Sequence, residues 1–295
     1  MPYQALDPER IFGRGCLLTI SEKSRSFHGG LMADPELLRY LAAKSGLGLK
    51  YLSKDEKISI LLGELRTRFP DVVMKGGTAI NRAYLSKSGV SRFSEDIDLD
   101  FISKSPLEKK ISSISERMKT IAAFEISGPH ILHRTLRFDC QYTNEFGDRD
   151  RIMAEFYLTK TRAVKTLDAL VASPFIETHP TIFTIYSLED LLARKLLALT
   201  NRGEGKDMYD VFYILEEKID CAAFDRALAF MQENYRIKSD SFPNDLIDKM
   251  HILRKNATYI GNSTNHFIPR QRRPDWGTFI DSLIQNLNNF FLKYR

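Results

Sequence analysis

The sequence has few cysteines, no long apolar run and a single tryptophan. Its three cysteines, Cys16, Cys140 and Cys221, are odd in number and widely spaced, and no C-x-x-C pair occurs. This argues against a disulfide framework or a cysteine zinc site and fits a reducing compartment. No apolar stretch approaches the roughly 20 residues of a membrane-spanning helix. The N-terminus, MPYQALDPER, lacks the basic and apolar regions of a secretory signal, so we expect a cytoplasmic chain without a membrane partner.

The composition is that of a globular protein with a small excess of positive charge. Hydrophobic residues make up 43% of the 295 residues and charged residues 27%, a mixture that excludes disordered or low-complexity architectures. Lys and Arg outnumber Asp and Glu by 43 to 38, which gives a formal net charge of +5. Basic residues recur from Arg254 to the C-terminus. Such an end suits a nucleic-acid or polyphosphate partner, although solvated loops explain it equally well.

Hydrophobic periodicity divides the chain into a mixed part and a helical part. It predicts helices over 34–46, 53–69 and 106–124, and strands over 71–75, 92–102, 132–142 and 151–159. After about residue 186 the remaining segments show helical spacing only. We therefore expect an α/β (α+β) fold, in which a mixed-sheet domain over 51–180 precedes a helical domain over 181–295. Residues 1–50 form an extension that includes the first predicted helix and has no assigned role.

The most informative segment is the predicted strand 92–102, RFSEDIDLDFI, which carries alternating carboxylates. Apolar side chains dominate one face, whereas Asp96, Asp98 and Asp100 share the other. Successive side chains on one face of a strand are about 6.5 to 7 Å apart, so two of them can converge on a divalent cation. Carboxylate oxygens select Mg²⁺ or Mn²⁺ rather than zinc. The alternative is an edge strand with a solvated acidic face, which protects against aggregation.

A double glycine lies upstream of these carboxylates, between the predicted strand 71–75 and the helical pattern AINRAYL. Glycines at a strand-to-helix turn leave backbone N–H groups accessible, and a helix N-terminus adds positive potential, so Lys75-Gly76-Gly77-Thr78 suits a phosphate group. The segment contains no P-loop motif. On its own, a tight turn would explain the glycines as well.

Taken together, the motifs resemble those of a known family. The order strand, double glycine, helix, strand and D-x-D is the signature of the polymerase-β-like nucleotidyltransferase fold. The strings KGGTA (75–79) and RFSEDIDL (92–99) resemble the AbiEii/MenT family of nucleotidyltransferase toxins, from bacterial type IV toxin–antitoxin and phage-defence systems. EDLLARKLLA (189–198) and RGEGKDMYD (202–210) look like that family's downstream motifs, with Lys206 where the family usually has Arg.

The resemblance implies an active site drawn from both parts of the chain. Asp96 and Asp98 would bind the metal and act as catalytic residues, together with Lys195, Asp207 and Asp210 of the helical part. The nucleotide would be held by the glycine turn and residues that the motifs place near it: Lys75, Gly76, Gly77, Thr78, Arg92, Ser94, Lys195 and Arg202. A solvated helix face with ion pairs between neighbouring turns is the alternative explanation for the helical charges.

A third carboxylate is expected from the same resemblance, because related enzymes often draw one from a neighbouring strand. Glu155 and Asp139 compete for this position. We favour Glu155 as a further metal ligand, since apolar residues flank it and a buried carboxylate without a partner is costly. An ordinary exposed acid fits the pattern as well.

The basic C-terminal end includes an arginine cluster, Arg270, Arg272 and Arg273, directly before Pro274 and Trp276. Proline near a helix start places these arginines in the loop that leads into the last helix. Loop arginines beside an aromatic ring suit RNA phosphates and a stacked base. Alternatively, the tryptophan anchors the last helix to the core and the arginines are solvated.

The function that follows from the resemblance is transfer of a nucleoside monophosphate from an NTP to an RNA acceptor, with Mg²⁺ or Mn²⁺ as cofactor. The implied acceptor is a tRNA 3′ end, whose blockage would stop translation, and the implied partners include a cognate antitoxin. Two alternatives stay open at this point. The chain could be an inactive nucleotide- or RNA-binding regulator of the same fold, or it could transfer the nucleotide to protein.

Overall fold

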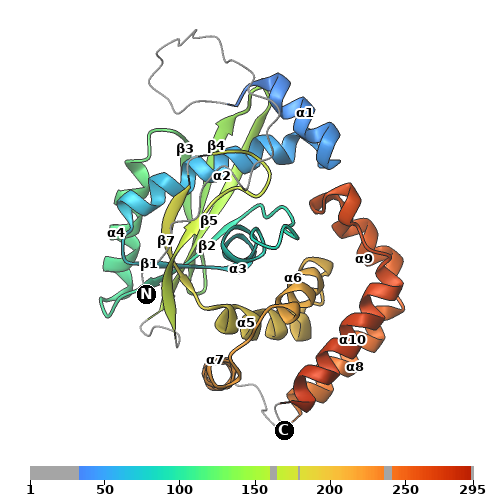
Figure 1. Ribbon diagram of the computed structural model, residues 1–295. Coiled ribbons are helices and arrows are strands. Elements are labelled where there is room, and N and C mark those ends of the chain that lie inside the picture. Colours follow the sequence, from blue (N-terminus) through green and yellow to red (C-terminus); the bar gives the residue numbers. More distant parts are fainter. Residues whose placement is uncertain (1–32, 160–164, 179, 236–240, 294–295) are drawn as a thin grey trace, which may run out of the picture. The chain divides into compact units, whose positions relative to one another are not determined.

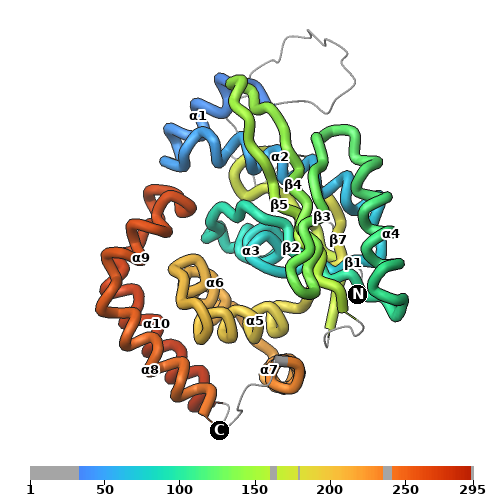
Figure 2. The backbone as a smooth tube through the Cα atoms, turned by 180° about the vertical axis from the view of Figure 1, so that it is seen from behind, coloured from blue at the N-terminus to red at the C-terminus, as the bar shows by residue number. Residues whose placement is uncertain are grey.

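The computed structural model describes residues 33–159, 165–178, 180–235 and 241–293. Most of the expected extension over 1–50 therefore lies outside the described residues, which begin at residue 33. The described residues belong to one compact unit. This unit is built on a mixed sheet, whose described strands follow the order β3-β4-β5-β2-β1-β7-β6 (Figures 1 and 2).

The sheet brings strands from distant parts of the chain together at its centre. Its strands are β1 (Val72–Lys75), β2 (Ile97–Ile102), β3 (Glu125–Leu132), β4 (Thr135–Thr143), β5 (Arg149–Thr159), β6 (Thr166–Val171) and β7 (Thr181–Tyr186). β1 is antiparallel to β2 and parallel to β7, and β2 is parallel to β5. The outer pairs β3–β4, β4–β5 and β6–β7 are antiparallel.

Helices pack on both faces of the sheet. They are α1 (Pro35–Ser45), α2 (Leu49–Arg68), α3 (Gly76–Ala79), α4 (Leu107–Lys119), α5 (Leu188–Asn201), α6 (Gly205–Glu216), α7 (Cys221–Tyr235), α8 (Phe242–Arg254), α9 (Ala257–Thr264) and α10 (Trp276–Leu292). α2 contacts β5 and β7, and α4 contacts β3. α5 packs against α6, α7 and α8, while α10 lies beside α8 in both views (Figures 1 and 2). Within the described ranges, no helix combines the length and apolarity that crossing a membrane requires.

The alternation of β2 decides which face carries the core. Ile97 and Leu99 are fully buried in the main hydrophobic core, which also receives Phe156 of β5 and Phe69 behind α2, with the two rings 4.9 Å apart. Asp98 and Asp100 point to the opposite face, toward α5. The apolar face is therefore closed by α2 and α4, and the carboxylate face is left for the helices that follow residue 188.

Most predicted elements are confirmed, with differences at the edges of the sheet. Helices 34–46, 53–69 and 106–124 and the hairpin of strands 132–142 and 151–159 correspond to α1, α2, α4, β4 and β5. β3, β6 and β7 were not predicted, and β3 contains Gly128-Pro129, which interrupts the strand pattern at an irregularity in its register. The expected division of the chain at residue 180 stays a prediction.

The predicted strand 92–102 is only half right, because the strand begins at Ile97. Upstream of it, the backbone is held by hydrogen bonds to segments outside the sheet. The Phe93 N–H donates to the carbonyl of Phe267 at 2.8 Å, and the Arg92 N–H donates to Asn81 Oδ1 at 2.8 Å. The alternating pattern of residues 92–95 therefore belongs to a loop whose side chains are buried in different directions, and not to a paired strand.

A buried ion pair fixes the segment that follows the double glycine. α3 continues directly into a π-helix over Ile80–Tyr84, so the glycines open a helix. Within the π-helix, Arg82 donates to the carboxylate and the main-chain carbonyl of Asp55 on α2 and to Ser59 Oγ at 2.8 Å. The side chains of Arg82 and Asp55 are only 3% and 2% exposed. The pair therefore ties α3 and the π-helix, which together we call the glycine helix (residues 76–84), to α2.

We expect Arg82→Met to lower the free energy of unfolding by about 3 to 5 kcal/mol, because it leaves the Asp55 carboxylate buried without its partner. The double variant Arg82→Met/Asp55→Leu should lose less than the sum of the single losses, since it removes both charges together. Urea denaturation of the four proteins measures this coupling. Additive losses would show that the two side chains act independently.

Candidate active site

The double glycine lies against the carboxylates of β2. Gly76 has a φ of +72°, which favours glycine, and a Cβ built there would lie 2.0 Å from Asp98 Oδ2. A Cβ on Gly77 would lie 2.8 Å from Ser94 Oγ and from the Arg92 guanidinium. Both positions therefore require glycine because functional side chains approach the backbone closely.

Asp96 and Asp98 form the acidic centre of the site. Burial, followed by the charges of Asp98 and Glu95, raises the pKa of Asp96 to about 6. Burial also raises the pKa of Asp98; the Lys75 ammonium opposes this rise and Glu155 adds to it. The Asp98 charge thus disfavours the ionised form of Asp96, and a bound cation would relieve this.

Glu155 lies next to Asp98, since the two residues are paired in the parallel register of β5 and β2. Its Oε1 accepts a hydrogen bond from Arg137 Nε at 2.7 Å. Asp139, the competing third acid, instead pairs with Arg151 at 3.0 Å and does not line the cavity that contains Glu155. The structure therefore brings Glu155 to the site, and its role as a metal ligand stays a prediction.

Asp210 joins three separate segments through buried charge. It is fully buried and accepts from Arg92 Nε at 2.9 Å, from Asn81 Nδ2 at 3.0 Å and pairs with Lys195 Nζ at 2.7 Å. Burial raises its pKa, but the Arg92 and Lys195 charges outweigh this and hold the pKa of Asp210 below its usual range. The two carboxylate oxygens of Asp210 thus hold the π-helix, the loop before β2 and α5 together.

Asp207, one turn earlier on α6, has a similar role. It is fully buried, pairs with Lys195 at 2.8 Å and accepts from Arg202 Nε at 2.7 Å. Burial raises the pKa of Asp207, yet Lys195 and Arg202 together hold it well below its usual range. The two acids of α6 therefore hold cations in place and are themselves saturated with partners.

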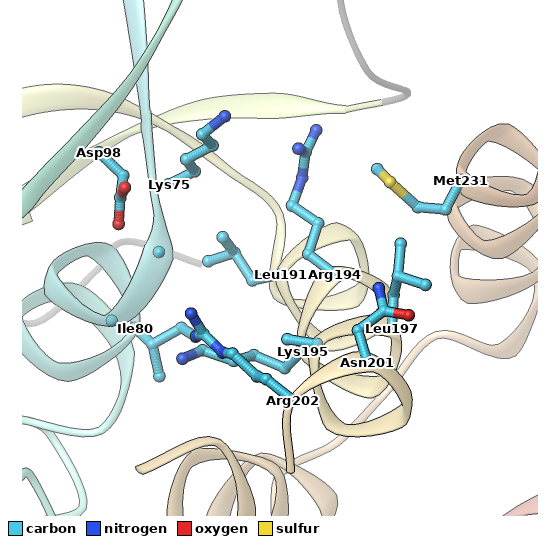
Figure 3. Close-up of a pocket in the computed structure, with 13 residues that line it drawn as sticks. Lys75, Ile80, Asp98, Leu191, Arg194, Lys195, Leu197, Asn201, Arg202 and Met231 are labelled. Carbon is cyan, nitrogen blue, oxygen red and sulfur yellow. The ribbon is translucent and has the colours of Figure 1, made fainter. Parts of the chain in front are cut away.

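Two cavities meet at these residues. We call the first the carboxylate cavity: it has a volume of about 270 Å³ and its lining includes Asp96, Asp98 and Glu155. The second, which we call the central cavity, has about 430 Å³ and is shown in Figure 3. Figure 3 places Asp98 and Lys75 on one side of the central cavity and Met231 on the other. Both cavities share four lining residues: Gly77, Asp98, Lys195 and Arg202.

The predicted nucleotide-binding residues fall into two groups. Most line a cavity: Lys75, Gly76, Gly77, Arg92, Ser94, Lys195 and Arg202. Thr78 lines neither; it is fully buried and donates its hydroxyl to the main-chain carbonyl of Asp96. Arg92 is only 3% exposed, and its guanidinium is engaged by Asp210 and the carbonyl of Phe93. Direct nucleotide contact by these two residues stays a prediction, and their observed contacts hold the loop before β2.

Three cavity-lining cations had no assigned role in the sequence. Arg194 lines the central cavity and lies 3.7 Å from Asp100, while Lys206 and Arg137 line the carboxylate cavity. Arg137 could have been found, because the predicted hairpin places it opposite Glu155. Lys206 lies 4.9 Å from the centre of the Phe267 ring, a contact between segments too distant in sequence to infer.

The C-terminal arginines lie far from the carboxylates in sequence, and one of them contacts the residue that follows α1. Arg273 donates to the carbonyls of Ile268 and Gly46, both at 3.1 Å. Trp276 is 5% exposed and donates Nε1–H to Asn265 at 2.8 Å, as an anchor of α10 would. Arg270 and Arg272 are exposed, and their contact with RNA stays a prediction.

The family comparison bears directly on this arrangement. A model of the nucleotidyl transferase AbiEii toxins of type IV toxin–antitoxin systems matches residues 60–292. The chain belongs to the AbiEii family. The matched range covers both the sheet with its carboxylates and the helices that carry Lys195, Asp207 and Asp210, so the resemblance predicted from the sequence motifs is confirmed. No curated protein matches the chain.

Two solved structures are similar to this chain over most of its length. The nucleotidyltransferase toxin MenT4 from Mycobacterium tuberculosis H37Rv is similar with a TM-score of 0.58 at 17% identity, over 87% of this chain and 90% of that chain. JHP933 from Helicobacter pylori gives a TM-score of 0.45 at 14% identity, over 84% of this chain and 97% of that chain. The likeness to MenT4 confirms the nucleotidyltransferase fold.

We expect Gly76→Ala to abolish most activity of this AbiEii protein while the fold persists. The added Cβ must displace the Asp98 carboxylate, and misplacement by about 1 Å can cost on the order of 100-fold in rate. Gly147→Ala is the matched control, because Gly147 also has a positive φ, of 86°, but no atom within 4 Å of the added Cβ. Both variants should lose similar stability in thermal melts. Equal activities would show that left-handed strain alone matters.

We expect Asp207→Asn to lower the free energy of unfolding by about 3 to 5 kcal/mol at pH 7, because Lys195 loses a buried partner. A depressed carboxyl pKa stabilises the fold above the unfolded-state pKa of about 3.9, and this stability is lost as pH falls toward the folded-state pKa. The difference between wild type and variant should therefore shrink below about pH 4. Urea denaturation across pH measures it, with the exposed Asp248→Asn as a control that shows no loss. A difference independent of pH would contradict the ionic origin.

Proposed function

We propose that the protein transfers a nucleoside monophosphate from an NTP to the 3′-hydroxyl of an RNA, and that this RNA is a tRNA. In this role the protein is the toxin of a toxin–antitoxin or phage-defence system. One observation carries the proposal. Asp96 and Asp98 face a cavity that Lys195 and Arg202 border from the helical side. Burial raises the pKa of both carboxylates, and neighbouring acids raise it further. Such a meeting of acidic and cationic groups suits a metal-bound polyphosphate.

The donor set fits a Mg²⁺ or Mn²⁺ ion that Asp96 and Asp98 would hold. Among the described residues, no group of three or more His, Cys, Asp or Glu side chains gathers as a self-sufficient metal site. Two carboxylates suffice for Mg²⁺, which usually binds through one or two protein carboxylates and substrate phosphates. When bound, such an ion would neutralise the charge that develops on the phosphoryl oxygens.

The protein's own groups would hold the triphosphate of the NTP. Lys195 and Arg202 line both cavities, and Asp207 fixes the position of each. The glycine helix adds N–H groups at the turn after β1, where an anion gains from the positive end of the helix. Asp207 and Asp210 act as positioning residues, because each is buried and forms ion pairs with two cationic side chains.

RNA is the acceptor that the family resemblance implies, and a direct assay separates it from protein. The purified enzyme is incubated with each α-³²P-labelled NTP, Mg²⁺ and either total RNA, purified tRNA or a protein extract. Label in tRNA that is lost after digestion of its 3′ end supports the proposal. Label in protein alone, or NTP binding without any label transfer, would overturn it.

We expect Asp96→Asn and Asp98→Asn each to lower turnover by at least 100-fold, because each removes an ionised oxygen ligand for the cation, worth several kcal/mol. Melting temperatures should not fall, since the substitution removes the repulsion between the two carboxylates. Asp168→Asn, an exposed acid on the distant strand β6, serves as the matched control. Turnover of either site variant within threefold of wild type would contradict the assignment. Chelation with EDTA should abolish wild-type turnover, and added Mg²⁺ should restore it.

A further inference from the structure

A third cavity opens farther along the carboxylate face of the sheet. It has a volume of about 610 Å³, which is within the range of ligand-binding sites. We call it the lateral cavity. Its walls come from β2 and the loop after it, the start of α4, the turn between β3 and β4, the end of β5, and the helices α5 and α7. None of the residues assigned to the metal or the triphosphate lines it.

The lateral cavity is positively charged. Its cationic lining residues are Lys104, Lys110, Arg134 and Arg194. The carboxylate among its described lining residues is Asp100, which already accepts hydrogen bonds from Lys75 and, at 2.6 Å, from the Tyr186 hydroxyl. Arg194 is paired with Asp190 and lies 3.7 Å from Asp100, so the positive charge that the cavity offers an anion comes mainly from Lys104 and Arg134 at its exposed rim.

The lateral cavity is a neighbour of the central cavity, with which it shares a lining residue. Arg194 lines both the lateral and the central cavity. Lys75 borders the central cavity and lies 4.5 Å from the centre of the Tyr157 ring, which lines the lateral cavity. An extended ligand that ran from Asp98 to the lateral cavity would lie over Lys75 and Arg194.

The dimensions fit a short single strand. From Asp98 to Asp100, the residue of β2 that lines the lateral cavity, the strand advances two residues, or about 7 Å. Stacked nucleotides of one strand rise about 3.4 Å each, so roughly two nucleotides would separate a 3′ end at Asp98 from those that enter the lateral cavity. Tyr157 and Phe230 supply aromatic surface among the cations, and single-stranded nucleic acids bind where basic grooves carry aromatic side chains.

We propose that the lateral cavity binds the phosphodiester backbone of the acceptor RNA, in the unpaired nucleotides just upstream of its 3′ end. The inference rests on the proposed function and adds the path of the acceptor. Lys104 and Arg134 contact phosphates at the outer rim, where both are exposed. Lys110 is buried deeper and is oriented by its hydrogen bond to the carbonyl of Thr159, at 3.1 Å.

The test compares two double charge reversals with the same change in net charge. Lys104→Glu/Arg134→Glu alters the lateral cavity, whereas Lys87→Glu/Lys119→Glu alters exposed lysines that do not line it. The ligand is a fluorescent RNA hairpin with a four-nucleotide 3′ overhang. We expect the cavity variant to raise the Kd at least tenfold and to reduce the salt slope by about 2, because two phosphate contacts are lost. The KM for NTP should stay within twofold of wild type.

Several outcomes would overturn the inference. The two double variants could weaken RNA binding equally, which would mark a general charge effect, or the cavity variant could raise the KM for NTP, which would make the cavity a nucleotide subsite. A blunt hairpin separates these cases further, because wild type and cavity variant should bind it with equal Kd. Failure of the proposed function is distinguishable: wild type would then transfer no label to RNA in the assay above, whatever the Kd values are.

Discussion

The structure of this site depends on one buried carboxylate. Asp210 receives hydrogen bonds or ion pairs from Asn81 of the π-helix, Arg92 of the loop before β2 and Lys195 of α5. A buried charge is tolerated only with partners, so the three segments that supply them are placed together or not at all. The sheet and the later helices thus share a common anchor beneath the cavities. Without it, the carboxylates of β2 and the cations of α5 would have no fixed distance from one another.

Charge is divided unequally between the two sides of the site. On the helical side, Asp207 and Asp210 are saturated by cations, and their pKa values are held low. On the strand side, Asp96 and Asp98 lie near each other and their pKa values are raised. The first pair makes a rigid frame, whereas the second retains unfavourable electrostatic energy that a ligand can relieve. Asp207 and Asp210 therefore hold the site together, whereas Asp96 and Asp98 are available to a ligand.

The sequence predicts the parts of this site that depend on local pattern. The alternation of Asp98 and Leu99, the double glycine and the hairpin around Glu155 all follow from periodicity and turn chemistry, and the structure has them in place. The partners of Asp210 could not be predicted, because Asn81 and Arg92 lie more than 100 residues away in sequence. The sequence does not reveal β6 and β7 because their apolar residues are not confined to the buried face, as Leu167, Leu170 and Ile182 are exposed. Strand 92–102 was overextended because a loop buried on two sides imitates the alternation of a strand.

The carboxylate and central cavities share a wall, so a ligand bound in one can affect binding in the other. Gly77, Asp98, Lys195 and Arg202 border both spaces, so a ligand that shifts any of them reshapes the neighbouring space. Thermodynamic linkage makes that influence reciprocal: whatever free energy the first ligand contributes to binding of the second, the second contributes to the first. Two ligands bound in these cavities would therefore not occupy independent compartments, and a change in the affinity of one would be matched by a change in the affinity of the other.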